Sequence, residues 1–172
     1  MNKSKFIVRT GIIAAVYIVL TVVFGAISYG PIQFRISELL VFLAYINPFY
    51  IAGLALGCLI SNLFGPMGIY DAIFGTLHTV ISLSAMALAA RYIKNQNWSL
   101  MIASLFPALF SFIIAWELAV FLPGESFWYN YLWVAFGEFV VVTVVGVPFM
   151  MYLRRKTNWI DRLKKVCNSA GY

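Results

Sequence analysis

Charged residues and metal-binding side chains are scarce in this 172-residue sequence. It has six acidic residues, one histidine and two cysteines, and only 10% of its residues are charged. A single histidine excludes a histidine-rich metal centre, and Cys58 and Cys167 lie far apart in the expected fold, so we predict no disulfide and no metal site. The sequence also lacks a G-x-x-x-x-G-K-[ST] phosphate loop, an H-E-x-x-H helix and a G-x-S-x-G turn. We therefore expect no enzymatic activity, no cofactor and no nucleotide hydrolysis by this chain.

Apolar residues are correspondingly abundant. They make up 63% of the chain and give a mean hydropathy of +0.90, whereas soluble domains contain roughly 45–50% apolar residues. A soluble fold of this length has too little interior for so many apolar side chains, so lipid is the expected solvent. The first apolar run is too long and unbroken for a signal peptide, and no cleavage pattern follows it. We expect residues 1–172 to form a single integral membrane domain.

Six apolar segments predict an all-α bundle of six transmembrane helices, because about 20 helical residues cross about 30 Å of hydrocarbon. The stretch from Ser37 to Leu63 is too long for one crossing and is interrupted by Asn47-Pro48. Proline tends to end the preceding helix, so we expect the second and third helices there, both short. Short spans are tolerated where the backbone lines a cavity or is covered by protein. The longer segments run from about Phe6 to Ala26, Asp71 to Lys94, Ser99 to Leu122 and Tyr131 to Leu153.

The basic residues orient this bundle. With six crossings, eleven of the twelve fall on one face, and Arg35 falls on the other. The positive-inside rule makes the face with eleven residues cytoplasmic, with both termini inside. The net charge of +6 thus indicates topology and affinity for anionic membrane lipid, not nucleic-acid binding. The eleven residues are Lys3, Lys5, Arg9, Arg91, Lys94, Arg154, Arg155, Lys156, Arg162, Lys164 and Lys165.

Titratable side chains gather in the outer half that this topology predicts. Charged groups within a membrane are costly and usually face a cavity or a partner. Glu138 is the hardest to explain otherwise, because its helix is apolar and the neighbouring Gly137 permits close approach to the backbone. These titratable residues are Glu38, Asp71, His78, Glu117 and Glu138.

Most of these side chains also have a structural interpretation. Arg35 and Glu38 can form an interfacial pair at i, i+3, and Asp71 can cap a helix, where its charge suits the helix dipole. Glu117 lies close enough to the interface to reach water, and His78 can be a packing residue. Capping by Asp71 does not exclude a binding role.

Two further groups of residues leave alternatives open. The small residues Gly11, Ala14 and Ala15 in the first helix permit close helix packing, either within the bundle or against a second protein. The aromatic residues near the last outer loop suit an interfacial belt or a lid that stacks on a flat heterocycle. They are Trp116, Trp128, Tyr129, Tyr131 and Trp133.

Several sequence blocks resemble the substrate-binding S component of an energy-coupling factor (ECF) transporter, and within that group the QueT family. These blocks are "AAVYIVLT" (14–21), "QFRISELL" (33–40), "GCLISN" (57–62), "DAIFGTLHT" (71–79) and "FGE" (136–138). The resemblance covers nearly the whole chain. It implies six helices, a substrate pocket in the outer half, and a loop after the first helix that helps to cover the pocket.

The resemblance also implies partners and a substrate class. S components dock on a transmembrane coupling subunit through an Ala-x-x-x-Ala stripe, matched here by Gly11-x-x-x-Ala15, and two cytoplasmic ATPases drive import. The QueT family is thought to import queuosine precursors, which are deazaguanines. Another heterocyclic vitamin or nucleobase is the alternative substrate, and a stand-alone carrier is the alternative class.

We expect the substrate site to combine residues from these blocks with neighbouring polar and aromatic residues. A carboxylate, either Glu38 or Glu138, would accept two N–H donors from the guanine-like edge. Arg35 would hold Glu38 ionised and oriented, or donate to the base carbonyl. The expected substrate-binding residues are Gln33, Arg35, Glu38, Asn62, Asp71, His78, Trp116, Glu117 and Glu138.

Overall fold

The computed structural model describes residues 3–30 and 32–156, and within these ranges the chain consists of helices and loops without a strand. The predicted all-helical class is confirmed for this part of the chain. In order, the elements are α1 (Lys3–Val23), α2 (Gly25–Ser28), η1 (Ile36–Val41), α3 (Phe42–Ile46), η2 (Pro48–Tyr50), α4 (Ile51–Asn62), α5 (Ile69–Tyr92), α6 (Gln96–Ser104), α7 (Phe106–Phe110), α8 (Phe112–Phe121), α9 (Phe127–Glu138), η3 (Phe139–Gly146) and α10 (Val147–Lys156).

Consecutive elements join into longer helical stretches. Two shorter apolar stretches, Ile36–Ile46 and Pro48–Asn62, meet at Asn47. Four other stretches are long and apolar enough to cross a membrane: Lys3–Val23, Ile69–Tyr92, Gln96–Phe121 and Phe127–Arg155.

The break at Asn47-Pro48 is confirmed, and its cause is local. Asn47 has extended backbone angles (φ −156°, ψ 125°), and its side-chain oxygen accepts a hydrogen bond from the N–H of Phe49 at 2.9 Å. Pro48 occupies the first helical position, where its missing N–H costs nothing. One short helix therefore ends at Ile46 and the next begins at Pro48, with only Asn47 between them.

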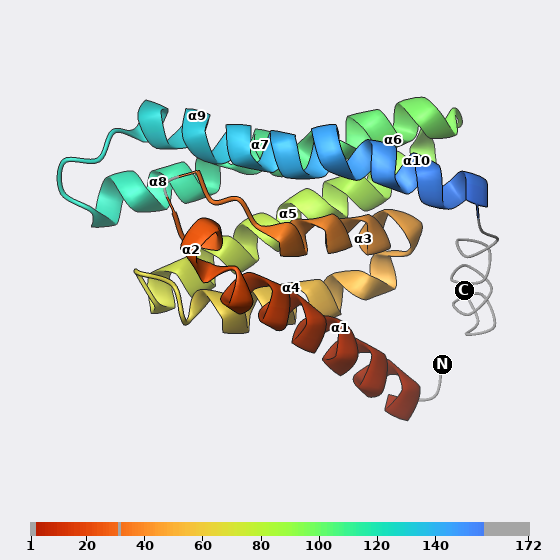
Figure 1. The fold of residues 1–172 in the computed structure, drawn as a ribbon, viewed down its shortest axis with the longest axis horizontal. Helices are drawn as coiled ribbons and strands as arrows, with labels where there is room; N and C mark the ends of the chain where they lie inside the picture. Colours follow the sequence, from red (N-terminus) through yellow and green to blue (C-terminus); the bar gives the residue numbers. More distant parts are fainter. Residues whose placement is uncertain (1–2, 31, 157–172) are drawn as a thin grey trace.

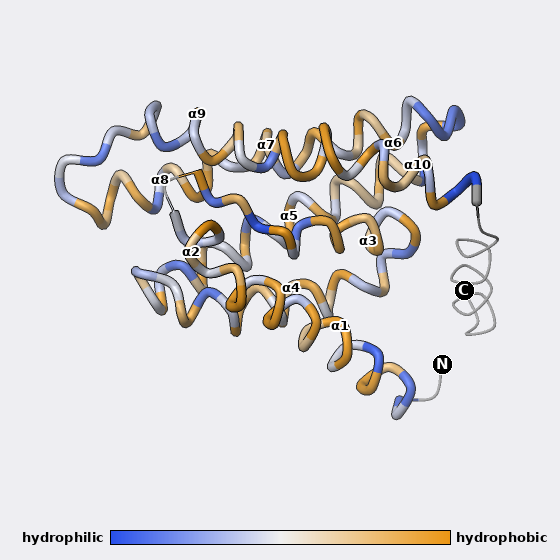
Figure 2. The backbone as a smooth tube through the Cα atoms, viewed as in Figure 1, coloured by the Kyte–Doolittle hydropathy of each residue, from blue (hydrophilic) through white to orange (hydrophobic). Residues whose placement is uncertain are grey.

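The helices run roughly lengthwise, so the molecule has two distinct ends (Figure 1). The α4–α5 and α8–α9 loops and α2 lie at the left end of that view, whereas the start of α1 and the end of α10 lie at the right end. Hydrophilic residues concentrate at the ends and in a central strip near η1, while the flanks of the bundle are mainly hydrophobic (Figure 2).

Helix α5 shows how the interior divides along its length. Its first half buries polar residues, including Asp71 and His78, whereas its second half buries Leu83, Met86 and Ala89. The apolar part belongs to a core that also contains side chains from α3, α4, α6 and α10. One half of the bundle is therefore a packed apolar core, and the other half holds the buried polar groups.

Helix α1 packs closely on α4 because two glycines of α4 face it. A Cβ on Gly57 would lie 2.7 Å from the Cβ of Tyr17, and one on Gly53 would lie 3.1 Å from the Cβ of Ile13. Only 17% of the most apolar window of α1 is buried, which suits a helix surrounded largely by lipid. Its exposed apolar residues are Ile7, Val8, Ile12, Val16, Val19, Val22 and Val23.

The last two long stretches depart from regular α-helix at the points where they touch. The first breaks at Leu105, just before Pro107, and the second adopts a π-helix over Phe139–Gly146. The hydroxyl of Thr143 donates to the carbonyl oxygen of Ser104 at 3.0 Å. An inserted hydroxyl and a proline are common causes of such departures.

We expect Gly57→Ala to destabilise the protein, because the new methyl group would overlap Tyr17 and force α1 away from α4. Overpacking of this kind costs about 1–3 kcal/mol, which thermal unfolding in detergent would detect as a lower melting temperature. Gly11→Ala is the matched control, since a Cβ there meets nothing within 4 Å and alanine favours a helix. Equal melting temperatures for Gly57→Ala and the wild type would contradict the tight α1–α4 contact.

Candidate functional site

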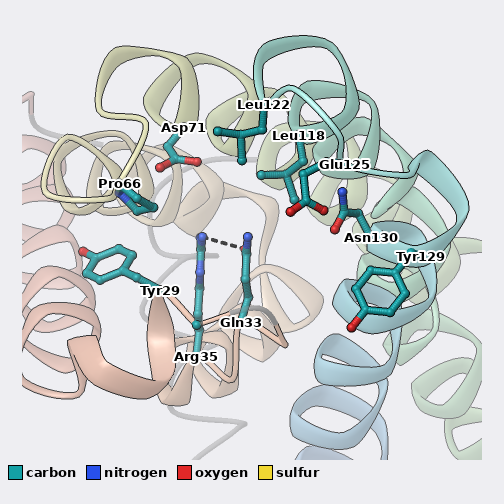
Figure 3. Close-up of a pocket in the computed structure, with 11 residues that line it drawn as sticks. Tyr29, Gln33, Arg35, Pro66, Asp71, Leu118, Leu122, Glu125, Tyr129 and Asn130 are labelled. Carbon is teal, nitrogen blue, oxygen red and sulfur yellow. Dashed lines mark hydrogen bonds between the residues drawn. The ribbon is translucent and has the colours of Figure 1, made fainter.

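A cavity of about 370 Å³ opens at the end of the bundle formed by α2, the α4–α5 loop and the α8–α9 loop. Its wall combines one arginine, two acids, two side-chain amides and two tyrosines with three apolar side chains, so it can bind a small polar molecule that has an apolar face. Figure 3 shows these side chains around a common space. The lining residues are Tyr29, Gly30, Gln33, Arg35, Pro66, Asp71, Leu118, Leu122, Glu125, Tyr129 and Asn130.

The loop after α2 supplies the first wall. Gln33 adopts a φ of +53°, a left-handed conformation that costs a non-glycine residue about 1–2 kcal/mol. Its side-chain oxygen accepts a 2.9 Å hydrogen bond from Arg35, whose Nε donates to the carbonyl of Ser28 at 3.4 Å (Figure 3). Partial burial raises the pKa of Tyr29, which stays protonated and donates to the carbonyl of Ser61 at 2.6 Å. The loop therefore holds Arg35 in a fixed position at the cavity.

The start of α5 supplies the second wall. Asp71 is buried, and its Oδ2 accepts a hydrogen bond from the N–H of Met67 at 3.0 Å. The amide of Asn62 donates to the carbonyl oxygen of Asp71 at 2.9 Å and thereby ties α4 to α5. Asp71 thus stabilises the α4–α5 loop and also faces the cavity, whereas Asn62 does not line it.

The corner between α8 and α9 supplies the third wall. Pro123 and Gly124 occupy the middle of a turn closed by a 3.3 Å bond from the N–H of Glu125 to the carbonyl of Leu122. Gly124 has a φ of +89°, the conformation that a type II turn requires after a proline. The turn places Glu125 on the cavity wall, and Asn130 follows in the first turn of α9 (Figure 3).

A second polar cluster joins α1, η1 and α9. The hydroxyl of Tyr17 donates to Oε1 of Glu38, and both side chains are buried. Glu138 is buried as well, and its Oε2 has no hydrogen-bond partner among the described residues. A Cβ on Gly137 would overlap the carbonyl oxygen of Ile32, so the loop between α2 and η1 closely approaches the backbone there.

Arg35 lies between the cavity and this cluster. It is 7% exposed, lines the cavity, and interacts electrostatically with Glu38 and Glu138. It also interacts with Glu117, whose fully buried carboxylate lies near Asp71 and has no hydrogen-bond partner in the described part of the chain. Within the described residues, the guanidinium donates hydrogen bonds to Ser28 and Gln33 of the loop, so its interaction with these acids involves no direct hydrogen bond.

Two predicted site residues have other contacts. The Nε2 of His78 lies 2.9 Å from the carbonyl oxygen of Pro107, which links α5 to α7. His78 is seven residues beyond Asp71, and therefore about 10 Å further along the helix. Trp116 is 49% exposed and packs against Phe74, with ring centroids 5.4 Å apart. Neither side chain lines the cavity.

The small residues of α1 divide between two faces. Ala14 is buried, and its carbonyl would lie 3.1 Å from a Cβ on Gly57, so Ala14 belongs to the packing with α4. Gly11 and Ala15 are exposed, outside the contact with α4. An exposed small-residue stripe therefore contains Gly11 and Ala15 but not Ala14.

Some of the predicted substrate-binding residues line the cavity, together with residues that the sequence interpretation did not propose. Gln33, Arg35 and Asp71 line it. The missed residues are Tyr29, Glu125 and Asn130, whereas Tyr129, one of the aromatic residues considered for a lid, also lines the cavity. The predicted residues that do not line it, and whose binding roles stay predictions, are Glu38, Asn62, His78, Trp116, Glu117 and Glu138.

A helical bundle with several membrane-length apolar helices and a polar cavity at one end has the architecture of a membrane transport protein. The family model described as QueT transporter matches residues 7–155. The queuosine precursor transporter QueT of Lactococcus lactis subsp. cremoris (strain MG1363) is 41% identical over 126 residues, which cover 70% of this chain and 72% of that protein. No solved structure matches the chain significantly. The chain belongs to the QueT transporter family and is a multi-pass protein of the cell membrane.

We expect Tyr17→Phe to destabilise the protein, because it removes the hydroxyl that donates to the buried Glu38. Leaving a buried acceptor without its partner costs about 1–3 kcal/mol, measurable as a lower melting temperature in detergent. Tyr131→Phe is the matched control, since its hydroxyl makes only an exposed 3.5 Å contact with the carbonyl of Leu109. Identical melting curves for both variants would contradict a stabilising role for the Tyr17–Glu38 bond.

Proposed function

We propose that the protein is the substrate-binding S component of an ECF-type importer and binds a queuosine precursor of the 7-deazaguanine type in the cavity at the end of the bundle. The observation that carries the proposal is the convergence of Gln33, Arg35 and Asp71 on that cavity. These residues come from two sequence blocks that are far apart in the chain. The name of the Lactococcus lactis relative, a queuosine precursor transporter, supports this substrate class.

The chemistry of the wall suits a deazaguanine. Such a base is flat and carries a carbonyl next to N–H donors, so it needs a cationic or amide donor, carboxylate acceptors and an apolar or aromatic face. The cavity supplies these groups as Arg35, Gln33, Asp71, Leu118 and Tyr129. An analogue that lacks one of these ligand groups would leave the corresponding polar group of the site buried without a partner. The site therefore discriminates against such analogues.

The distribution of basic residues supports an outward-facing cavity. Eight described lysines and arginines lie near the start of α1, the α5–α6 loop and the end of α10, at the opposite end of the bundle from the cavity (Figures 1 and 2). In the proposed topology six helices, including the two short ones, cross the membrane as a single domain with both termini in the cytoplasm. The remaining predicted basic residues of the C-terminal tail lie outside the described residues.

The exposed face of α1 supports docking on a partner. Gly11 and Ala15 lie on its exposed side among larger apolar residues, and small residues allow close helix–helix approach in a membrane. In the proposed function the transmembrane coupling subunit binds there, and two cytoplasmic ATPases supply the energy for import. The absence of a phosphate loop from the sequence agrees with this division of labour.

Calorimetric titration of the purified protein tests the substrate. We expect a 7-deazaguanine precursor to bind tightly, while riboflavin gives no heat and guanine binds more weakly. Arg35→Gln should weaken binding by about tenfold or more, since a hydrogen bond from a charged group contributes about 1.5–3 kcal/mol. Arg91→Gln, at the opposite end of α5, is the control.

Two outcomes of the same titration would contradict the proposal. Heat from a different vitamin and none from any deazaguanine would refute the substrate and leave the transporter class standing. Wild-type affinity in Arg35→Gln would refute the cavity as the binding site.

Uptake into vesicles tests the coupling. We expect uptake only when the coupling subunit and both ATPases are present, and we expect Ala15→Leu to reduce it by about tenfold or more, equivalent to about 1.4 kcal/mol of docking free energy. Substrate binding should be unchanged in this variant. Val16→Leu, which adds one methylene on the same exposed surface, should transport normally. Uptake by the chain alone would instead identify a stand-alone carrier.

A further inference from the structure

The corner between α8 and α9 carries two polar side chains that no sequence motif had singled out as ligand-binding. Glu125 and Asn130 lie on the same wall of the cavity, across from Arg35 and Gln33 (Figure 3). Glu125 is exposed, and its carboxylate makes no hydrogen bond to the described residues. Asn130 is only 8% exposed, and its Nδ2 has no partner in the described part of the chain.

An unpartnered amide nitrogen in a buried position is unusual. More than nine-tenths of buried polar groups in proteins are hydrogen-bonded, and an unsatisfied donor costs about 1–3 kcal/mol. An isosteric leucine would avoid that cost. Because the last torsion of an asparagine side chain is broad, its NH₂ group can turn to the cavity without moving the backbone. The amide of Asn130 is therefore a hydrogen-bond donor available to a bound molecule.

The local backbone fixes the position of Glu125. Glu125 ends the turn that Pro123 and Gly124 form, and Gly124 adopts the left-handed conformation with a φ of +89°. A carboxylate on such a constrained turn loses less conformational freedom when it binds a ligand than one on a flexible loop.

The other acids near the cavity are already engaged or out of reach. Asp71 accepts the N–H of Met67, and Glu38 accepts the hydroxyl of Tyr17. Glu38, Glu117 and Glu138 do not line the cavity, and the backbone of Ile32 lies against Gly137, next to Glu138. Glu125 is thus the cavity-lining acid whose carboxylate is uncommitted.

We propose that Glu125 and Asn130 together recognise one edge of the bound heterocycle. The carboxylate of Glu125 accepts hydrogen bonds from a ring N–H and the adjacent exocyclic NH₂, and the amide of Asn130 donates to the neighbouring carbonyl oxygen. The ligand class is a planar heterocycle that presents carbonyl, ring N–H and amino groups in a row, as guanine and 7-deazaguanine do. The inference rests on the proposed function and names the groups of the cavity that select the base.

The test pairs two ligands with four proteins in calorimetric titrations. The ligands are 7-deazaguanine and its analogue without the 2-amino group, 7-deazahypoxanthine. The proteins are the full-length wild type, Glu125→Ala, Asn130→Leu and the control Ser126→Ala, whose side chain is exposed, makes no capping bond and does not line the cavity.

We expect loss of the 2-amino group to weaken binding to the wild type and to Ser126→Ala by about tenfold or more. In Glu125→Ala the two ligands should bind with similar, weaker affinity, because the acceptor of the amino group is gone. An undiminished difference between the ligands in Glu125→Ala would overturn the role of Glu125.

Asn130→Leu separates ligand recognition from a structural role. We expect its melting temperature without ligand to equal or exceed that of the wild type, because the variant removes a buried donor without a partner, while its affinity for both ligands falls by about tenfold or more. A lower melting temperature with unchanged affinity would overturn the role of Asn130. Failure of the wild type to bind any 7-deazaguanine would refute the proposed function and this inference with it, whereas the variant outcomes refute the inference alone.

Discussion

The buried guanidinium of Arg35 is the constraint on which the polar half of the molecule depends. A charge removed from water must be compensated by hydrogen bonds and opposite charges. The loop from Ser28 to Gln33 provides the hydrogen bonds. Glu38, Glu117 and Glu138, on three different helices, lie within electrostatic range of it. One arginine therefore links the loop between α2 and η1 electrostatically to three parts of the bundle, and the cavity forms where that loop meets the α4–α5 and α8–α9 corners.

The two halves of the bundle have different roles. The apolar core between α3, α4, α6 and α10 contains tightly packed side chains such as Leu54, Leu83 and Met86, which are at most 1% exposed. Close packing of this kind stabilises a scaffold. The polar half retains groups that weaken it, including the unpaired carboxylate of Glu117 and the left-handed Gln33. Such strain and unsatisfied groups are typical of ligand-binding sites, where the ligand supplies what the fold lacks.

The sequence predicted the helices better than it predicted which side chains meet. Apolar length and the Asn47-Pro48 break were enough to divide the chain, because both act locally. The cavity depends on how each helix is rotated about its axis, which packing decides. Glu138 was the strongest candidate from the sequence; it does not line this cavity, and its binding role stays a prediction. Asn130 lies within a run of aromatic residues, and only the burial of its amide nitrogen without a hydrogen-bond partner distinguishes it.

The π-helix between Phe139 and Gly146 has a consequence for the last long stretch as a whole. Hydrogen bonds from i to i+5 place more residues in each turn than an α-helix does, so side chains beyond the segment are rotated about the axis relative to an uninterrupted α-helix. Before it, Gly137 contacts the loop between α2 and η1; at its end, a Cβ on Gly146 would overlap the ring of Phe42. The two ends of one continuous stretch thus have separate angular phases, and a single helical wheel drawn across residues 127–156 would misplace side chains on one side of the π-helix relative to those on the other.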